Sequence, residues 1–460
     1  MVVAQARRSL GKEGPSPMHL AFKGGIHPDS HKEMTAQKTI ELMAQPRRVT
    51  LPMSMHAGPP ATPRVAVGDR VCLGEKIADS SDHTAVPVHA TVSGTVREIA
   101  PKPHPFGGQV LSVAIDNDEQ DEMAPGIRPI DSDVMKPAAI IEEIREAGLV
   151  GHGGAAFPTH LKLENALGRV DTVLINAAES EPYITSDHRI MLEYPWELMG
   201  GIKLLRRILD VRQVHIGIES DKKDTLPILR EYQPPDESVK IVRLPTKYPQ
   251  GAEKQLIRAV LGRRVPPGKL PADVGVIVLN VDTVCAIYRL FVTGMPVVRR
   301  IVTVSGSAIS NPKNLEVRIG TPVEDLIAAC GGAVQAPQRL LMGGPMMGVA
   351  LSTTEVPVIK ATSGIVAFCK GESAGAKSPH CIRCGKCVDA CPMGLMPLYL
   401  DAAARKGSMH QLERYHLNTC TECGACAYVC PGKMPLVEGI RAGKIRVQAA
   451  AHIEPSTSEE

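Results

Sequence analysis

Eight of the twelve cysteines lie in two sets with the same spacing, near the C-terminal end of the chain. In each set two residues separate the first three cysteines, three residues precede the fourth, and a proline follows it. Runs of this kind hold two [4Fe–4S] clusters, and the fourth cysteine of each run binds the cluster of the other run. The expected ligands are Cys381, Cys384, Cys387 and Cys430 for one cluster, and Cys420, Cys423, Cys426 and Cys391 for the other.

Zinc sites are the alternative for these cysteines, but they use two or three thiolates per turn and rarely this doubled run of four. A disulfide framework is typical of small secreted chains. This chain has 460 residues, and we expect no signal peptide because its N-terminus lacks an apolar stretch. Four scattered cysteines are expected to be core residues: Cys72, Cys285, Cys330 and Cys369.

A glycine-rich turn and several polar turns form a second group of candidates. The turn Gly151 to Gly154 lets the backbone approach a phosphate or a planar ring, and Lys162 could meet a phosphate. The spacing is not that of the Rossmann fingerprint, so a structural turn is the alternative. The turn Asn176 to Pro182 directly follows a predicted strand, where ligands bind in open α/β sheets. Further turns are 248–254 and 280–283, together with 343–348, which we expect to be a hinge or packing loop.

The elements that must position these residues change along the chain. Short valine-rich segments with Gly and Asp turns predict strands near the N-terminus, and 67–71 and 92–96 look like halves of a lipoyl-type sandwich. Apolar strands at 172–176, 214–218 and 275–280 alternate with helices, which predicts a largely parallel sheet. The expected domains are a β-rich barrel-sandwich domain (1–135), an α/β domain (136–299), a small α+β module (300–362), a helical cysteine domain (363–450) and a polar tail (451–460).

Composition restricts the class of protein. The length predicts two to four domains. A net charge of +3 gives no reason to expect nucleic acid, and 43% hydrophobic with 22% charged residues is ordinary for a folded chain. No apolar run approaches the roughly 18 residues of a spanning helix. We therefore expect a multidomain α/β protein of the cytoplasm with no nucleic-acid partner and no membrane span of its own.

Longer motifs resemble a known family. The segments 148–159 and 176–182 look like the flavin loop and acidic turn of the NADH-binding flavoprotein subunit of respiratory complex I. The segments 24–28, 248–257 and 343–348, with the doubled cysteine set, resemble RnfC over nearly the whole chain. RnfC is one of the subunits of the Rnf ion-translocating ferredoxin:NAD oxidoreductase complex. The resemblance implies a lipoyl-like β sandwich, a Rossmann-like α/β FMN domain, a soluble-ligand-binding β-grasp (SLBB) module and an α-helical two-cluster ferredoxin domain.

The resemblance also implies roles for individual residues. The positions that match the family's FMN site are Gly151, Gly153, Gly154, Lys162, Asn176, Glu179, Ser180, Tyr248, Gly251, Asn280 and Thr283. The positions that match contacts to the nicotinamide nucleotide, and so are the catalytic candidates, are Phe157, Glu181 and Glu253. Departures from the complex I pattern are His152 in place of Arg, and Ala178 and Ala252 in place of acids; Ser180 keeps the complex I form, where RnfC chains usually have Cys.

In function, the resemblance implies a peripheral subunit that passes electrons between NAD(H), FMN and two [4Fe–4S] clusters. The expected partners are the membrane subunits of an Rnf-type complex and ferredoxin or flavodoxin. The expected location is the cytoplasmic face of the inner membrane, with attachment through partner subunits. Two alternatives remain: an RnfC-like cobalamin reductase of a microcompartment, and a cluster-carrying scaffold without flavin, which the departures at His152, Ala178 and Ala252 suggest.

Overall fold

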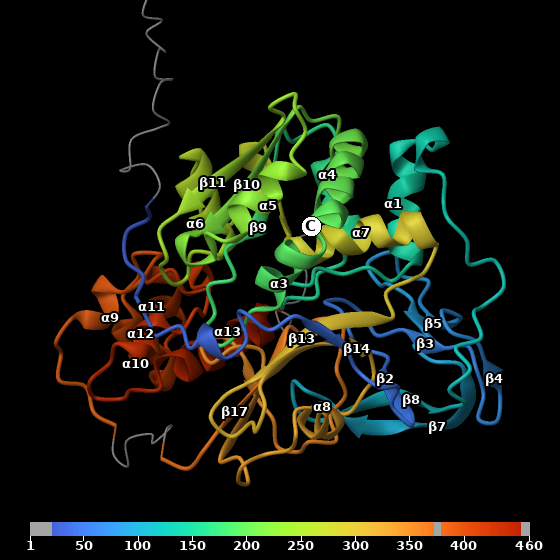
Figure 1. Ribbon diagram of the computed structural model, residues 1–460. Helices are drawn as coiled ribbons and strands as arrows, with labels where there is room; N and C mark the ends of the chain where they lie inside the picture. Colours follow the sequence, from blue (N-terminus) through green and yellow to red (C-terminus); the bar gives the residue numbers. More distant parts are fainter. Residues whose placement is uncertain (1–20, 372–378, 452–460) are drawn as a thin grey trace, which may run out of the picture.

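The computed structural model describes residues 21–371 and 379–451 (Figure 1). The β-rich N-terminal part contains two small antiparallel sheets, with strand orders β2-β8-β7-β4 and β3-β5-β6. Arg70 pairs with Thr95 and Val71 with Gly94, so the two segments expected to match lie side by side. The strands are β2 (Arg48–Pro52), β3 (Thr62–Pro63), β4 (Arg70–Val71), β5 (Lys76–Asp79), β6 (Val88–His89), β7 (Gly94–Pro103) and β8 (Gln109–Asn117).

The α/β part has a four-stranded parallel sheet in the order β11-β10-β9-β12. Helices cover both faces, because neighbouring residues of β9 enter different cores: Val173 and Ile175 pack with α1, α4 and α7, and Leu174 packs with α6. The strands are β9 (Thr172–Ala177), β10 (Gln213–Glu219), β11 (Val239–Leu244) and β12 (Val276–Asn280). The helices are α1 (Pro137–Glu146), α2 (Thr159–Ala166), α3 (Ser186–Glu193), α4 (Pro195–Leu209), α5 (Thr225–Glu231), α6 (Glu253–Leu261) and α7 (Val281–Thr293).

A six-stranded mixed sheet lies next to the α/β part, in the order β1-β14-β13-β17-β15-β16 (Figure 1). It is wider than the module expected at 300–362, since β1 comes from the N-terminal segment and β17 follows residue 362. β1 pairs with β14, and β17 pairs with β13. The two added strands thus hydrogen-bond backbone groups that would be unpaired if β13 and β14 were edge strands. The elements are β1 (Ile40–Leu42), β13 (Arg299–Ser305), β14 (Lys313–Arg318), α8 (Val323–Ala329), β15 (Arg339–Met342), β16 (Val349–Ala350) and β17 (Gly364–Phe368).

The cysteine domain is built from short helices. Its core is formed by apolar residues such as Leu400, Leu412 and Ile440. The helix α13 can pack closely on α10 because residue 439 is a glycine: a methyl group there would collide with Oδ1 of Asp401. The helices are α9 (Lys386–Asp389), α10 (Pro397–Lys406), α11 (Met409–Arg414), α12 (Ala425–Tyr428) and α13 (Leu436–Ala451). No helix among the described residues is both long and apolar enough to cross a membrane.

A buried lysine joins three of these parts. Lys360, at 2% exposure, donates hydrogen bonds from Nζ to the carbonyl oxygens of Pro87 (2.8 Å) and Gly148 (2.6 Å). Desolvation lowers the pKa of Lys360 to about 7. A neutral amine has two N–H groups, which is the number that the two carbonyls accept. Gly148 leads directly into the glycine loop, so Lys360 fixes the start of that loop.

Replacing Lys360 with Met is expected to destabilise the protein by about 2–4 kcal/mol at pH 7, since two buried carbonyls lose their donor. Between pH 7 and about 10 the unfolded lysine holds a proton that the folded one lacks. Stability contributed by Lys360 should therefore rise with pH, by up to about 1.4 kcal/mol per pH unit. Urea unfolding of both proteins from pH 7 to 9 measures this, with the exposed Lys269→Met as control; a difference that stays constant with pH would contradict it.

Candidate functional site

The strand order of the parallel sheet reverses between β9 and β12, and ligands bind in open α/β sheets at such a point. The turns predicted to hold a ligand meet there. A methyl group at Gly153 would lie 3.6 Å from Cβ of Asn280, and one at Gly251 would lie 3.4 Å from Asn176 Oδ1 and from Ser180 Oγ. The structure thus brings together residues that are up to about 130 positions apart in the sequence.

The glycine loop is fastened to the start of α7. The N–H of His152 donates to Oγ1 of Thr283 (2.9 Å), and Nδ1 of His152 lies 2.9 Å from Oδ2 of Asp282. Arg300 also bonds Asp282 and the carbonyl of His152. Desolvation lowers the pKa of His152 to about 4, so the imidazole is neutral. The histidine that replaces the arginine of complex I therefore serves to pack the glycine loop against α7.

The turns after β9 and β11 hold each other. Nδ2 of Asn176 donates to the carbonyl of Gly251 (2.8 Å), and the N–H of Gly251 is 3.3 Å from Oγ of Ser180. Gly154 has a φ of 101°, a backbone conformation that favours glycine. Glycines thus lie on both loops, at 151, 153 and 154 on one and at 251 on the other. Backbone without side chains lets a planar ring approach closely, so these residues fit a flavin.

Two of the expected flavin residues cap helices. The carboxylate of Glu179 accepts hydrogen bonds from the N–H groups of Asp187 (2.6 Å) and His188 (3.3 Å) at the start of α3. The side chain of Asn280 caps α7 and donates from Nδ2 to Asp187 (2.6 Å). Burial and the charges of Glu179 and Asp282 raise the pKa of Asp187 to about 8, so its carboxyl is protonated at pH 7. Sequence reasoning missed Asp187, although an acid in the first turn of a helix after a polar turn was a signal for it.

The candidate nucleotide residues occupy different surroundings. Phe157 is 46% exposed on the glycine loop, and Glu253 forms a half-buried ion pair with Lys162 (2.7 Å). Glu181 is partly buried and accepts hydrogen bonds from the N–H groups of Met346 (3.0 Å) and Met347 (2.8 Å). Burial raises its pKa to about 7. The loop 343–348 is therefore a packing loop, as expected, and it also caps a site carboxylate.

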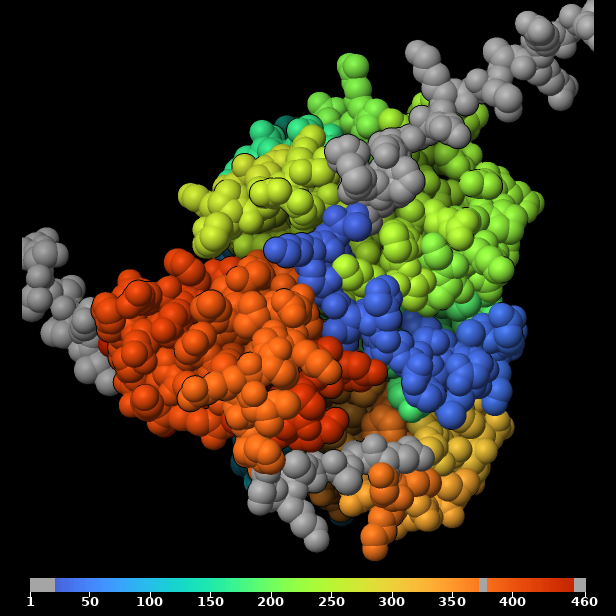
Figure 2. All heavy atoms as spheres, turned by 90° about the vertical axis from the view of Figure 1, so that its left-hand side faces the viewer, coloured from blue at the N-terminus to red at the C-terminus, as the bar shows by residue number. Residues whose placement is uncertain are grey.

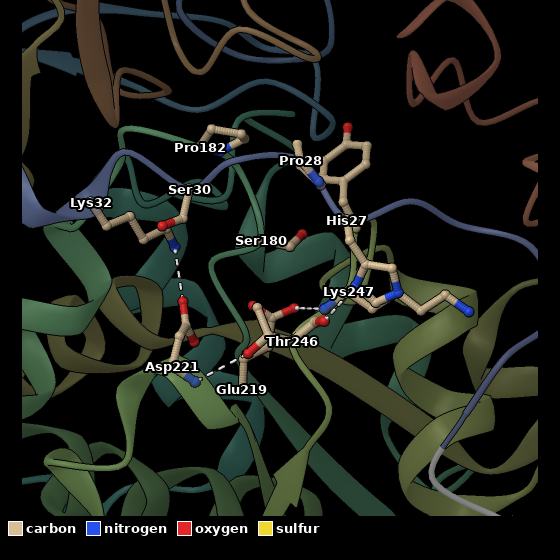
Figure 3. A pocket seen from close by; sticks show the side chains of 11 residues that line it. His27, Pro28, Ser30, Lys32, Ser180, Pro182, Glu219, Asp221, Thr246 and Lys247 are labelled. Atoms are coloured by element: carbon tan, nitrogen blue, oxygen red, sulfur yellow. Dashed lines mark hydrogen bonds and ion pairs between the residues drawn. The ribbon is translucent and has the colours of Figure 1, made fainter. Parts of the chain in front are cut away.

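A polar cavity lies beside Ser180, at the carboxyl ends of β10 and β11 (Figure 3). Lys32 enters it from the N-terminal segment and lies 3.8 Å from Asp221 and 3.9 Å from Glu179. Burial and the neighbouring Lys222 lower the pKa of Lys32 to about 8. Sequence reasoning did not single out Lys32, because nothing near it in the chain shows that it reaches this sheet.

The eight clustered cysteines divide between two cavities. One is lined by Cys381, Cys384, Cys387 and Cys430, and the other by Cys391, Cys420, Cys423 and Cys426. The fourth cysteine of each set thus faces the cavity of the other set. Among the described residues, no three His, Cys, Asp or Glu side chains converge as around a single metal ion. A [4Fe–4S] cubane has its irons at separate corners, each taking one thiolate, so four thiols spread around a cavity fit it.

The two cavities repeat the same local geometry. The sulfur of the first cysteine in each set accepts from an N–H two residues later, 3.3 Å for Arg383 to Cys381 and 3.4 Å for Glu422 to Cys420. The sulfur of the fourth accepts from an N–H four residues later, at 3.4 Å in both sets. Hydrogen bonds to cluster sulfurs adjust reduction potentials. Burial differs, however: Cys381 and Cys384 are exposed, whereas Cys423 and Cys426 are buried.

Comparisons with known proteins cover the same parts. Family models match for the RnfC barrel sandwich hybrid domain (residues 20–120), the Nuo51 FMN-binding domain (144–289), the SLBB domain (301–350) and the 4Fe-4S dicluster domain (380–434). These matches agree with a multidomain α/β protein that contains FMN-binding and 4Fe-4S domains.

Relatives are similar over nearly the full length. The C subunit of the Na(+)-translocating ferredoxin:NAD(+) oxidoreductase complex of Acetobacterium woodii is 42% identical over 94% of this chain and 98% of its own. The C subunit of the proton-translocating ferredoxin:NAD(+) oxidoreductase complex of Clostridium ljungdahlii is also 42% identical, over 94% and 95%. Among solved structures, an air-oxidised NAD+-reducing [NiFe]-hydrogenase is 20% identical over 71% of this chain and 64% of that one, with a TM-score of 0.49.

Proposed function

Because this chain belongs to the RnfC family, we propose that it is the subunit of an ion-translocating ferredoxin:NAD(+) oxidoreductase complex that passes electrons between NAD(H), FMN and two [4Fe–4S] clusters. One observation carries the proposal: a single chain holds glycine-rich and polar turns at the switch point of a parallel sheet, together with two four-thiol cavities. When bound, FMN would take up a hydride and give up electrons one at a time, and the clusters would carry single electrons.

The chain's own residues would bind and orient these groups. The glycines at 151, 153, 154 and 251 give close backbone approach to the flavin, and Asn176 and Ser180 fix the loop that carries Gly251. The exposed ring of Phe157 offers a face on which a nucleotide base can stack. Glu181, on the turn after β9, and Glu253, at the start of α6, supply acceptors for the nucleotide. The eight cysteines at 381, 384, 387, 391, 420, 423, 426 and 430 supply one thiolate for each iron.

Partners follow from the family. The protein assembles with membrane subunits of the complex, exchanges electrons with ferredoxin or flavodoxin, and works at the cytoplasmic face of the membrane without entering it. Neither the chain nor its relatives favour a cobalamin reductase. The packing of His152 against Asp282 argues against the scaffold without flavin, because the departure at residue 152 leaves the glycine loop fastened in place.

Anaerobic reconstitution with FMN, iron and sulfide tests this function. NADH should bleach the flavin absorbance and then reduce the clusters, and the protein should pass electrons from NADH to a dye acceptor. Protein that binds both groups but is reduced neither by NADH nor by a low-potential donor would refute the proposal.

Replacing Glu181 with Gln should weaken NADH binding about fivefold, with flavin content unchanged. The carboxylate of Glu181 offers two acceptor oxygens and an amide only one, which the N–H groups of Met346 and Met347 already use, so the nucleotide loses about one hydrogen bond to this side chain. Anaerobic titration of the bound flavin with NADH measures the affinity. The exposed Glu355→Gln, outside the α/β domain, serves as the control. Unchanged affinity would limit Glu181 to holding the 343–348 loop.

A further inference from the structure

The sequence Gly-Gly-Ile-His-Pro at 24–28 has no part in the function proposed above, yet it lies between the two kinds of site. In Figure 2 the blue N-terminal segment crosses the surface between the yellow-green α/β domain and the orange-red cysteine domain. The N–H of Ile26 donates to the carbonyl of Tyr248 (2.8 Å), and the N–H of Tyr248 donates back to Ile26 (2.9 Å). The segment is thus bonded to the loop that carries Gly251.

The same segment contacts the cysteine domain through its two glycines. The N–H of Gly25 donates to the carbonyl of Ala390 (2.9 Å), the residue before Cys391. A methyl group at Gly24 would lie 2.5 Å from the carbonyl oxygen of Cys391 and 2.8 Å from its carbonyl carbon. Gly24 also has a φ of 76°. The backbone at Cys391 can therefore approach this closely only because residue 24 has no side chain.

Tyr248 makes a second contact with the cysteine domain. Its hydroxyl donates to the carbonyl of Cys423 (2.6 Å). Ile26, Tyr248, Ala390, Cys423 and Ala425 belong to one buried apolar cluster. Cys391 and Cys423 come from different cysteine sets, but their thiols line the same cavity. That cavity is therefore held at two points of its wall by residues bonded to each other.

We propose that Gly24, Gly25, Ile26 and Tyr248 form a clamp that fixes the buried cysteine cavity (Cys391, Cys420, Cys423, Cys426) against the loop that carries Gly251. The clamp rests on the proposed function, because it sets the position of the buried cluster relative to the flavin. Its members are positioning residues: they act through the backbone at Ala390, Cys391 and Cys423. Functional groups need placement to within about 0.5 Å, so a displaced wall slows transfer between them.

The test compares Gly24→Ala with Gly268→Ala in the full reconstituted protein. Gly268 has nearly the same φ, 73°, but nothing within 4 Å of an added methyl group, so the control reproduces the backbone strain without the collision. Gly24→Ala should keep its iron and flavin, shift the electron paramagnetic resonance spectrum of the buried cluster, and slow its reduction by NADH-reduced flavin at least about threefold. The exposed cluster's spectrum should not change.

Tyr248→Phe is the second variant, since it keeps the apolar packing and removes only the hydroxyl donor. It should shift the electron paramagnetic resonance spectrum of the buried cluster in freeze-quenched samples. If Gly24→Ala does not fold, this variant alone tests the clamp. Suppose that the wild-type protein holds flavin and clusters, that Gly24→Ala matches Gly268→Ala in spectrum and rate, and that Tyr248→Phe matches the wild type. This result would overturn the clamp and leave the function intact. Wild-type protein that binds no flavin or no clusters would overturn both.

Discussion

Replacing Cys391 with Ala is expected to remove the cluster of the second cysteine set, not that of its own set. The thiol of Cys391 faces the cavity of Cys420, Cys423 and Cys426, whereas Cys387 shares its cavity with Cys430. Iron should fall from about eight towards about four atoms per chain in both Cys391→Ala and Cys387→Ala. The clusters that remain in the two variants should differ.

The two remaining clusters can be distinguished because their cysteines differ in exposure. Cys381 and Cys384 are exposed, and Cys423 and Cys426 are buried. After Cys391→Ala only the exposed cluster remains, so an aqueous iron chelator should remove the residual iron quickly. After Cys387→Ala the buried cluster remains, and chelation should be slow. The partly buried Cys369→Ala, outside both sets, is the control and should keep all of its iron. Equal chelation rates in the first two variants would mean that each set binds its own cluster.

The sequence predicted the parts of the fold that rest on local patterns. The three apolar strands expected in the α/β part are β9, β10 and β12, and they are parallel. The edge strand β11 was not predicted, because its middle residues are partly exposed and charged residues interrupt the apolar pattern. The strands β1 and β17 show another limit. β1 joins strands that lie more than 250 residues later in the chain, and β17 pairs with β13 about 60 residues before it, so no local pattern records either pairing.

The candidate site divides in the same way. Turns at strand ends could be recognised because polar residues follow an apolar run, and the structure brings those turns together at one edge of the sheet. Lys32 could not be recognised, since it lies 147 residues from Glu179, whose carbonyl it contacts. The contact of Gly25 with Ala390 spans most of the chain. Such residues depend on how domains pack, which spacing within one motif does not reveal.

The largest effect on flavin is expected from Gly153→Leu. The glycine loop faces the start of α7, where the positive end of the helix dipole favours a phosphate. A methyl group at Gly153 makes only an ordinary contact of 3.6 Å with Asn280. The isobutyl group of leucine is larger and would occupy the space that a flavin against the glycine loop needs. Flavin content should fall from about one to below about 0.1 per chain, because the close backbone approach is lost.

Gly153→Ala is the matched control, because it adds only the tolerated methyl group and φ at residue 153 is not positive. It should keep most of its flavin. Fluorescence of the acid-extracted flavin gives the content, and the iron assay should show full clusters in both variants, since residue 153 lines neither thiol cavity. Full flavin in Gly153→Leu would mean that the cofactor does not bind against the glycine loop. Loss of flavin together with iron would mean that the two kinds of site do not fold independently.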